Sequence, residues 1–152
     1  MTFLKRILLV IFVVIFLVLP GKSRAQEDSS KFFDTSAEST YRVLDNAKTI
    51  VSQEITITNK EEYTYAPSYS ITLNIDSISD IEVANAQGAI PYTVTDKGDT
   101  KTINIDFPER IVGKGKKNEF TFSYLSSDYA SRTGSIFRVN LPPISNLNNF
   151  SS

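Results

Sequence analysis

The chain lacks both cysteine and histidine. These absences exclude disulfides, thiol nucleophiles, Ser-His-Asp triads and zinc sites built from Cys or His, because each of these needs a thiol or an imidazole. Hydrolysis by two paired carboxylates remains open, with Glu61 and Glu62, or Asp76 and Asp80, as the candidate acids. Acids scattered on the turns of a small domain are more often simply solvated. We therefore expect no enzyme activity, no catalytic residue and no cofactor.

Long helical patterns are also missing, because no stretch keeps apolar residues at i, i+3, i+4 and i+7 over several turns. At most, segment 126–132 has the composition for one helical turn. Instead, about eight runs alternate apolar and polar residues with a period of two, which is typical of strands with one buried face. In segment 67–76 the alternation places Tyr69, Ile71 and Leu73 on the buried face and Thr72 on the solvent face.

Turn signals separate these runs at short intervals, and "DKGD" at 96–99 predicts a hairpin. Many short strands with one apolar face bury that face by stacking two sheets, so we predict an antiparallel β-sandwich of about seven or eight strands, immunoglobulin-like in general class. Its predicted core contains Ile71, Leu73, Ile105, Phe120 and Phe122. A change of phase between Ile78 and Ile81 predicts a bulge, and Pro91 predicts an edge strand.

The first 25 residues read as a secretory signal. Lys5 and Arg6 precede the uncharged run "ILLVIFVVIFLVL" at 7–19, and the small residues Ser23 and Ala25 flank Arg24 at the expected cleavage site. The apolar run is shorter than the ~20 residues of a spanning helix, which favours cleavage over retention as a membrane anchor. We expect the mature chain to begin near Gln26 and to reach the membrane only if the segment stays uncleaved.

Charge argues against nucleic acid as a partner. The whole chain has 16 basic and 17 acidic residues; the first 25 residues carry four of the basic ones and no acid, which leaves 12 against 17 and a net charge of −5. Nucleic-acid binding depends on clustered Lys and Arg. The one dense basic cluster, "GKGKK" at 113–117, lies among glycines and is best explained as a solvated loop. Export without cysteine favours a bacterial cell surface.

Two sets of residues are candidates for binding. Tyr63, Tyr65 and Tyr69 lie close together in sequence and form a candidate face for a glycan or peptide, although tyrosines there can equally cap the core. For calcium, the candidate ligands are the acids on two predicted turns, Asp96, Asp99 and Asp128. Turn formation explains aspartate at these positions without a metal, so we expect no metal site.

Two segments carry a family resemblance: "YRVLDNAKTIVSQEITITNKEEYTYAPSYSITL" at 41–73 and "VGKGKKNEFTFSYLSSDYASRTGSIFRVNLPPISN" at 112–146. Together they resemble the N-terminal β-sandwich module that precedes a transglutaminase-like domain in some exported bacterial proteins. More distantly, they are similar to the luminal N-terminal region of the ribophorin I family. The resemblance implies an accessory or spacer module. The Cys, His and Asp of such a catalytic domain belong downstream, and no catalytic residue carries over to this chain.

These observations together predict a signal peptide at 1–25, a flexible leader at 26–36, a β-sandwich domain at 37–142 and a linker-like tail at 143–152. Pro142 and Pro143 favour a stiff, extended exit from the last strand. The expected function is that of a non-catalytic exported module, the front part of a cell-surface or envelope protein. Its expected partner is a downstream domain of the same polypeptide or another envelope protein. The alternative is a self-contained, adhesin-like secreted domain that binds glycan or peptide.

Overall fold

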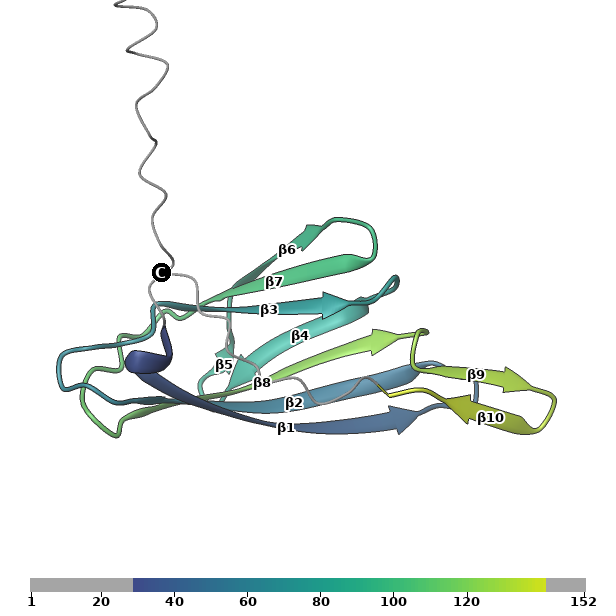
Figure 1. The fold of residues 1–152 in the computed structure, drawn as a ribbon, viewed down its shortest axis with the longest axis horizontal. Coiled ribbons are helices and arrows are strands. Elements are labelled where there is room, and N and C mark those ends of the chain that lie inside the picture. Colours follow the sequence, from purple (N-terminus) through teal and green to yellow (C-terminus); the bar gives the residue numbers. More distant parts are fainter. Residues whose placement is uncertain (1–28, 142–152) are drawn as a thin grey trace, which may run out of the picture.

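A computed structural model describes residues 29–141, which form strands and turns apart from one short 3₁₀ helix at Ser29–Lys31 (Figure 1). Within these residues no helix is long and apolar enough to cross a membrane. The strands are β1 (Phe33–Val43), β2 (Thr49–Asn59), β3 (Ser68–Asn74), β4 (Ser79–Asn85), β5 (Gly88–Ala89), β6 (Tyr92–Asp96), β7 (Thr100–Asp106), β8 (Lys117–Ser126), β9 (Ala130–Thr133) and β10 (Ile136–Val139).

The strands form two facing antiparallel sheets and a separate hairpin. The larger sheet has the order β1-β2-β8-β4-β5, the smaller has the order β3-β7-β6, and β9 pairs only with β10. The chain passes from the larger sheet to the smaller after β2 and again after β5, and returns after β3 and after β7 (Figure 1). This arrangement confirms the predicted antiparallel β-sandwich.

The core lies between the two sheets, where the alternating apolar faces meet. Along β2 and β8 every second residue is buried, as a strand with one wet face requires. The ring of Tyr69 in the smaller sheet packs edge-on against Phe120 in the larger one, with centroids 5.8 Å apart. Four of the predicted core residues are buried and Leu73 is partly buried against the same cluster, which confirms the predicted inner faces; the four are Ile71, Ile105, Phe120 and Phe122.

The turn predictions also hold. β6 and β7 form a hairpin across residues 96–101, closed by the Lys97 amide donating to the Thr100 carbonyl at 2.9 Å. β6, which follows Pro91, is an edge strand of the smaller sheet. The register between β4 and β8 shifts between Ser79 and Glu82, and Asp80 has a φ of 51°, so the predicted bulge is present.

Two predictions are wrong. The leader was expected to run to residue 36, but β1 begins at Phe33, because that side chain is buried in the core and its strand pairs with the end of β2 at Asn59. Segment 126–132, expected to form at most a helical turn, instead enters β9. Gly134, with a φ of 62°, supplies the left-handed turn that folds β9 back on β10. The predicted signal peptide at 1–25 and tail at 143–152 lie outside the described residues.

Candidate functional site

The structure separates the three tyrosines of the candidate binding face. Tyr63 is 88% exposed on the loop between β2 and β3. Tyr65 is half-buried, with the guanidinium carbon of Arg110 5.2 Å from its ring centroid. Tyr69 lies in the core, and burial raises its pKa to about 12. A surface ligand therefore cannot use Tyr69, and its place in the predicted face is wrong.

A second pair of tyrosines is also structural. The hydroxyls of Tyr124 and Tyr129 are 2.9 Å apart inside the core. Burial raises the pKa of both hydroxyls. For Tyr124 the hydrogen bond to Tyr129 adds to the effect, and its pKa lies well above the usual range. Each hydroxyl supplies the partner that the other needs, so this pair closes one end of the core and offers nothing to a ligand.

The candidate acids lie on loops, apart from Asp80, which lies in strand β4. Glu61, Glu62, Asp76 and Asp80 are all exposed, as a solvated role requires. Within residues 29–141, no group of three or more His, Cys, Asp or Glu side chains is placed to hold a metal ion. None of these side chains has the buried, paired setting in which a carboxylate becomes an acid catalyst.

Asp128 stabilises a junction between two turns. One of its carboxylate oxygens accepts hydrogen bonds from the backbone amides of Asp76 and Ser77, at 2.6 and 3.0 Å. The other accepts from the Ser77 hydroxyl at 3.0 Å, and Ser77 in turn lies 2.7 Å from the Ser127 hydroxyl. The carboxylate thus connects the β3–β4 turn to the β8–β9 turn, and this role accounts for the residue without a metal.

Asp96 has a similar local role in the β6–β7 turn. Its carboxylate accepts from the Gly98 amide at 2.9 Å and from the Lys101 ammonium at 2.7 Å. The hydrogen bond from Lys101, followed by that from Gly98, lowers the pKa of Asp96 below its usual value. The side chain of Lys101 is buried, and its ammonium also donates to the Gly98 carbonyl. The β6–β7 turn thus fixes the position of the ammonium through Asp96 and Gly98.

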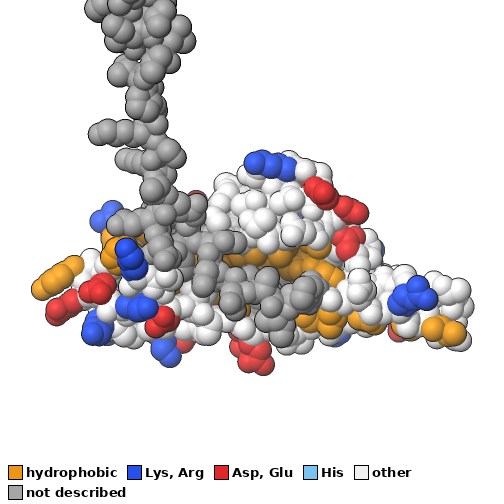
Figure 2. Space-filling view, viewed as in Figure 1, with side chains coloured by type: hydrophobic (Ala, Val, Ile, Leu, Met, Phe, Trp, Pro, Cys, Tyr) orange, Lys and Arg blue, Asp and Glu red, His pale blue; other side chains and the backbone are white. Residues whose placement is uncertain are grey.

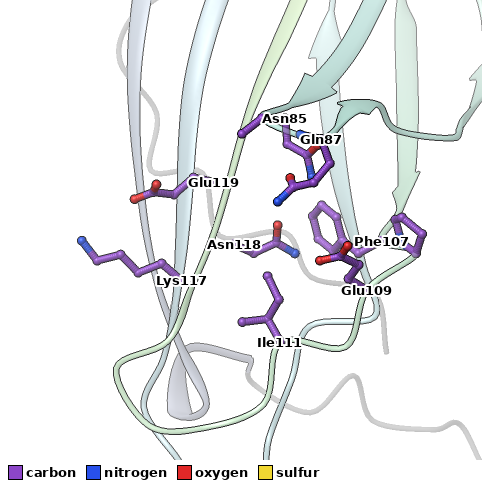
Figure 3. Close-up of a pocket in the computed structure, with 10 residues that line it drawn as sticks. Asn85, Gln87, Phe107, Glu109, Ile111, Lys117, Asn118 and Glu119 are labelled. Carbon is purple, nitrogen blue, oxygen red and sulfur yellow. Dashed lines mark hydrogen bonds between the residues drawn. The ribbon is translucent and has the colours of Figure 1, made fainter.

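A pocket of about 160 Å³ lies where the β4–β5 turn, the β7–β8 loop and the start of β8 meet (Figure 3). Asn85 and Gln87 line it from the first, Phe107 and Glu109 from the second, and Asn118 from β8. The polar ends of Gln87, Glu109 and Asn118 point toward one another across the pocket, whereas the side chains of Lys117 and Glu119 extend away from it (Figure 3).

Asn118 is the unusual residue of this pocket. It is only 8% exposed and occupies the position on β8 that continues the buried stripe of Phe120 and Phe122. Its carboxamide makes no hydrogen bond to any residue in the range 29–141 and opens into the pocket (Figure 3). Its amide nitrogen and oxygen are not among the enclosed, unpaired atoms of residues 29–141, so they keep access to solvent through the pocket.

Asn59 provides the contrast. It is also buried, at the end of the neighbouring strand β2, but its side-chain nitrogen donates to the carbonyls of Thr64 and Ile111 at 2.8 and 2.7 Å. Asn59 therefore holds two loops together. Both asparagines are buried at the same end of the core. The hydrogen bonds of Asn59 give it a structural role, whereas the carboxamide of Asn118 has no such role within residues 29–141.

The sequence does not predict this pocket, although it contains one signal of it. In "NEFTFSYL" the alternation that buries Phe120, Phe122 and Tyr124 places Asn118 on the same face. A polar residue in phase with a buried stripe indicates a group that needs a partner. The sequence contains no comparable signal for Gln87 and Glu109, which come from distant turns.

The other distinctive surface is the hairpin of β9 and β10, which extends beyond the end of the sandwich (Figure 1). Hydrophobic and basic side chains lie on this projecting end (Figure 2). Arg132 fastens the hairpin to the β1–β2 turn by donating to the Asp45 carbonyl at 2.9 Å, and its guanidinium lies over the ring of Phe137. The apolar side chains that it exposes, here called the hairpin surface, are Ile136, Phe137, Val139 and, just beyond β10, Leu141.

Comparison with models of known protein families gives no match, and comparison with curated proteins gives no significant one.

Proposed function

We propose that this chain is a non-catalytic exported module that supports a neighbouring domain of the same polypeptide in a cell-surface or envelope protein. The resemblance to modules that precede transglutaminase-like domains supports the proposal, as does the lack of the imidazole and thiol that amide chemistry uses. The hairpin surface is the observation that carries it. The role of such a module is to hold and orient the domain that performs the chemistry.

The hairpin surface has the character of a docking site rather than of ordinary solvent-facing strand. A two-stranded ribbon is marginally stable in water, and exposed clusters of large apolar side chains mark contact surfaces. Ile136 is 72% exposed, Phe137 is 40% exposed, and Leu141 is the last residue before the double proline. Leu141, the last described residue, belongs to this surface, so a domain that continues the polypeptide would be joined to the module at this end.

Hydrogen exchange tests the docking. The amides of β9 and β10 are expected to exchange rapidly in the 152-residue chain and slowly in the product of the complete reading frame. The double variant Ile136→Ser, Phe137→Ser in that longer product should restore rapid exchange in the hairpin without changing exchange in β2 and β8. Equal hairpin exchange in the short and long chains contradicts the proposal. So does a stop codon directly after Ser152, which favours the self-contained glycan- or peptide-binding alternative.

Activity assays test the non-catalytic role. The pure chain is expected to incorporate no labelled amine into a glutamine-containing protein and to hydrolyse no casein. Activation of a Ser or Cys nucleophile usually comes from an adjacent imidazole, and the chain contains none. Turnover that copurifies with the chain and disappears when one acid or lysine is replaced would disprove the accessory role.

A further inference from the structure

We propose that the pocket between the β4–β5 turn, the β7–β8 loop and the start of β8 binds one neutral sugar unit through its hydroxyl groups, with Asn118 at the centre of the contact. This site is separate from the hairpin surface and does not depend on the docking role proposed above. Three observations carry the inference: the unpartnered amide of Asn118, the chemistry of the groups around it and the aromatic wall beside them.

The first observation is the position of Asn118 on β8. An apolar residue at this position of β8 would continue the buried stripe, whereas the carboxamide of Asn118 has no partner in residues 29–141 and opens into the pocket. Asn59 shows that this end of the core can satisfy an amide when the amide has a structural task. A ligand that enters the pocket supplies what Asn118 lacks.

The second observation is which ligand atoms the pocket can satisfy. The carboxamides of Asn118 and Gln87 each present two N–H donors and one oxygen acceptor, and the carboxylate of Glu109 only accepts (Figure 3). A hydroxyl group both donates and accepts, so a polyhydroxylated ligand satisfies all three groups. An ammonium ion only donates and would leave the amide N–H groups unpaired, while an anion would meet the charge of Glu109.

The third observation is the wall formed by Phe107. Its backbone amide donates to the Pro67 carbonyl at 2.9 Å, and its ring packs on Phe120 with centroids 5.3 Å apart. The ring is thus held in place beside the polar groups, where it offers an apolar surface to the C–H groups of a sugar ring. The volume of about 160 Å³ is below the ~300–1,000 Å³ typical of pockets for drug-sized ligands, which limits the occupant to one small ring.

NMR titration of the full chain tests the proposal directly. The probes are the methyl glycosides of glucose, galactose and N-acetylglucosamine, with butylammonium chloride as the cationic comparison. At least one glycoside is expected to shift the side-chain amide signals of Asn118 and Gln87 in a saturable way. Free glucose, galactose and N-acetylglucosamine, titrated alongside, show whether the site takes free sugar as well as the end of a glycan.

Matched variants separate a ligand role from a structural one. Asn118→Leu is expected to weaken glycoside binding by about tenfold or more through the lost hydrogen bonds, while the melting temperature stays equal or rises. Asn59→Leu is expected to lower the melting temperature, because it leaves the Thr64 and Ile111 carbonyls without their donor. Glu109→Gln keeps the shape of the pocket and gives a second measure of binding, and Lys97→Ala, on the β6–β7 turn, should bind as the parent does.

Several results would overturn the sugar site. One is the absence of a saturable shift with every glycoside, and another is unchanged affinity in Asn118→Leu. Stronger binding of butylammonium than of any glycoside would reassign the pocket to a cationic side chain. The glycoside titrations do not involve the hairpin surface. A negative titration therefore contradicts only the sugar site, and a negative hydrogen-exchange experiment contradicts only the docking proposal.

Discussion

Replacement of Phe122 by alanine gives the most demanding test of the sandwich. Phe122 is 0% exposed on β8, which pairs with β2 on one side and with β4 on the other. Its register partners are Gln53 and Val83, and its ring lies 5.1 Å from that of Tyr124. Because hydrogen bonds hold the β8 backbone on both sides, the strand cannot move inward to fill the space that the ring leaves.

The expected cost follows from that rigidity. Loss of the transfer free energy of a buried Phe side chain accounts for about 1.5–3 kcal/mol. The unfilled cavity adds to it, so Phe122→Ala should lower the free energy of unfolding by about 3–5 kcal/mol. For a domain of this size that corresponds to a fall in melting temperature of roughly 10–20 °C.

Urea denaturation followed by circular dichroism measures this cost, with Phe137→Ala as the matched control. Phe137 is 40% exposed and its ring mainly faces Arg132, so its removal should cost only about 0.5–1 kcal/mol. The slope of unfolding free energy against urea should stay the same in both variants. A cost for Phe122→Ala below about 1 kcal/mol would refute the assigned inner face, because a shift of one residue in register moves the side chain to solvent.

Two further predictions concern the polar groups. Burial raises the pKa of Tyr69 from 10.0 to about 12. Above pH ~10 the unfolded chain therefore loses the hydroxyl proton while the folded chain keeps it. The free energy of unfolding should fall by about 1.4 kcal/mol per pH unit up to pH ~12 through this group. The raised pKa values of Tyr124 and Tyr129 lower the free energy of unfolding in the same direction. Urea midpoints measured across this pH range check the slope, and midpoints that do not change with pH would contradict burial of the three hydroxyls. Asp128→Ala should cost about 1–2 kcal/mol through the lost turn contacts, and equal thermal stability of Asp128→Ala and Asp99→Ala would show that the junction contributes nothing.

Local patterns in the sequence were enough to determine most of the strands and most of their faces. The alternation in 67–76 placed Tyr69 and Ile71 on the buried side, because successive side chains of a strand point to opposite faces whatever the strand packs against. The same pattern already argued against Tyr69 as a surface ligand, and its proximity in sequence to Tyr63 was misleading. The β6–β7 hairpin could also be predicted, since "DKGD" contains the Asp and Gly residues that favour a turn.

Strand β9 is an element that local sequence patterns do not predict. The residues "ASRT" at 130–133 contain one apolar side chain, so no alternation marks them as a strand. They become one by pairing with β10, and Arg132 then fixes the hairpin to Asp45, far away in sequence. Hydrogen bonds to a partner strand, rather than the propensity of the segment, decide such a case.

The candidate sites divide in the same way. The sequence alone excluded histidine- and cysteine-based chemistry, because a missing functional group is missing in every fold. It also placed Asn118 in phase with the buried face of β8. Only the tertiary structure brought Gln87 and Glu109 to Asn118, because that meeting depends on β4 pairing with β8 and on the return of the chain from β7 to the larger sheet. Strand order is a long-range property that no period within a strand encodes, and it decides which polar groups share a pocket.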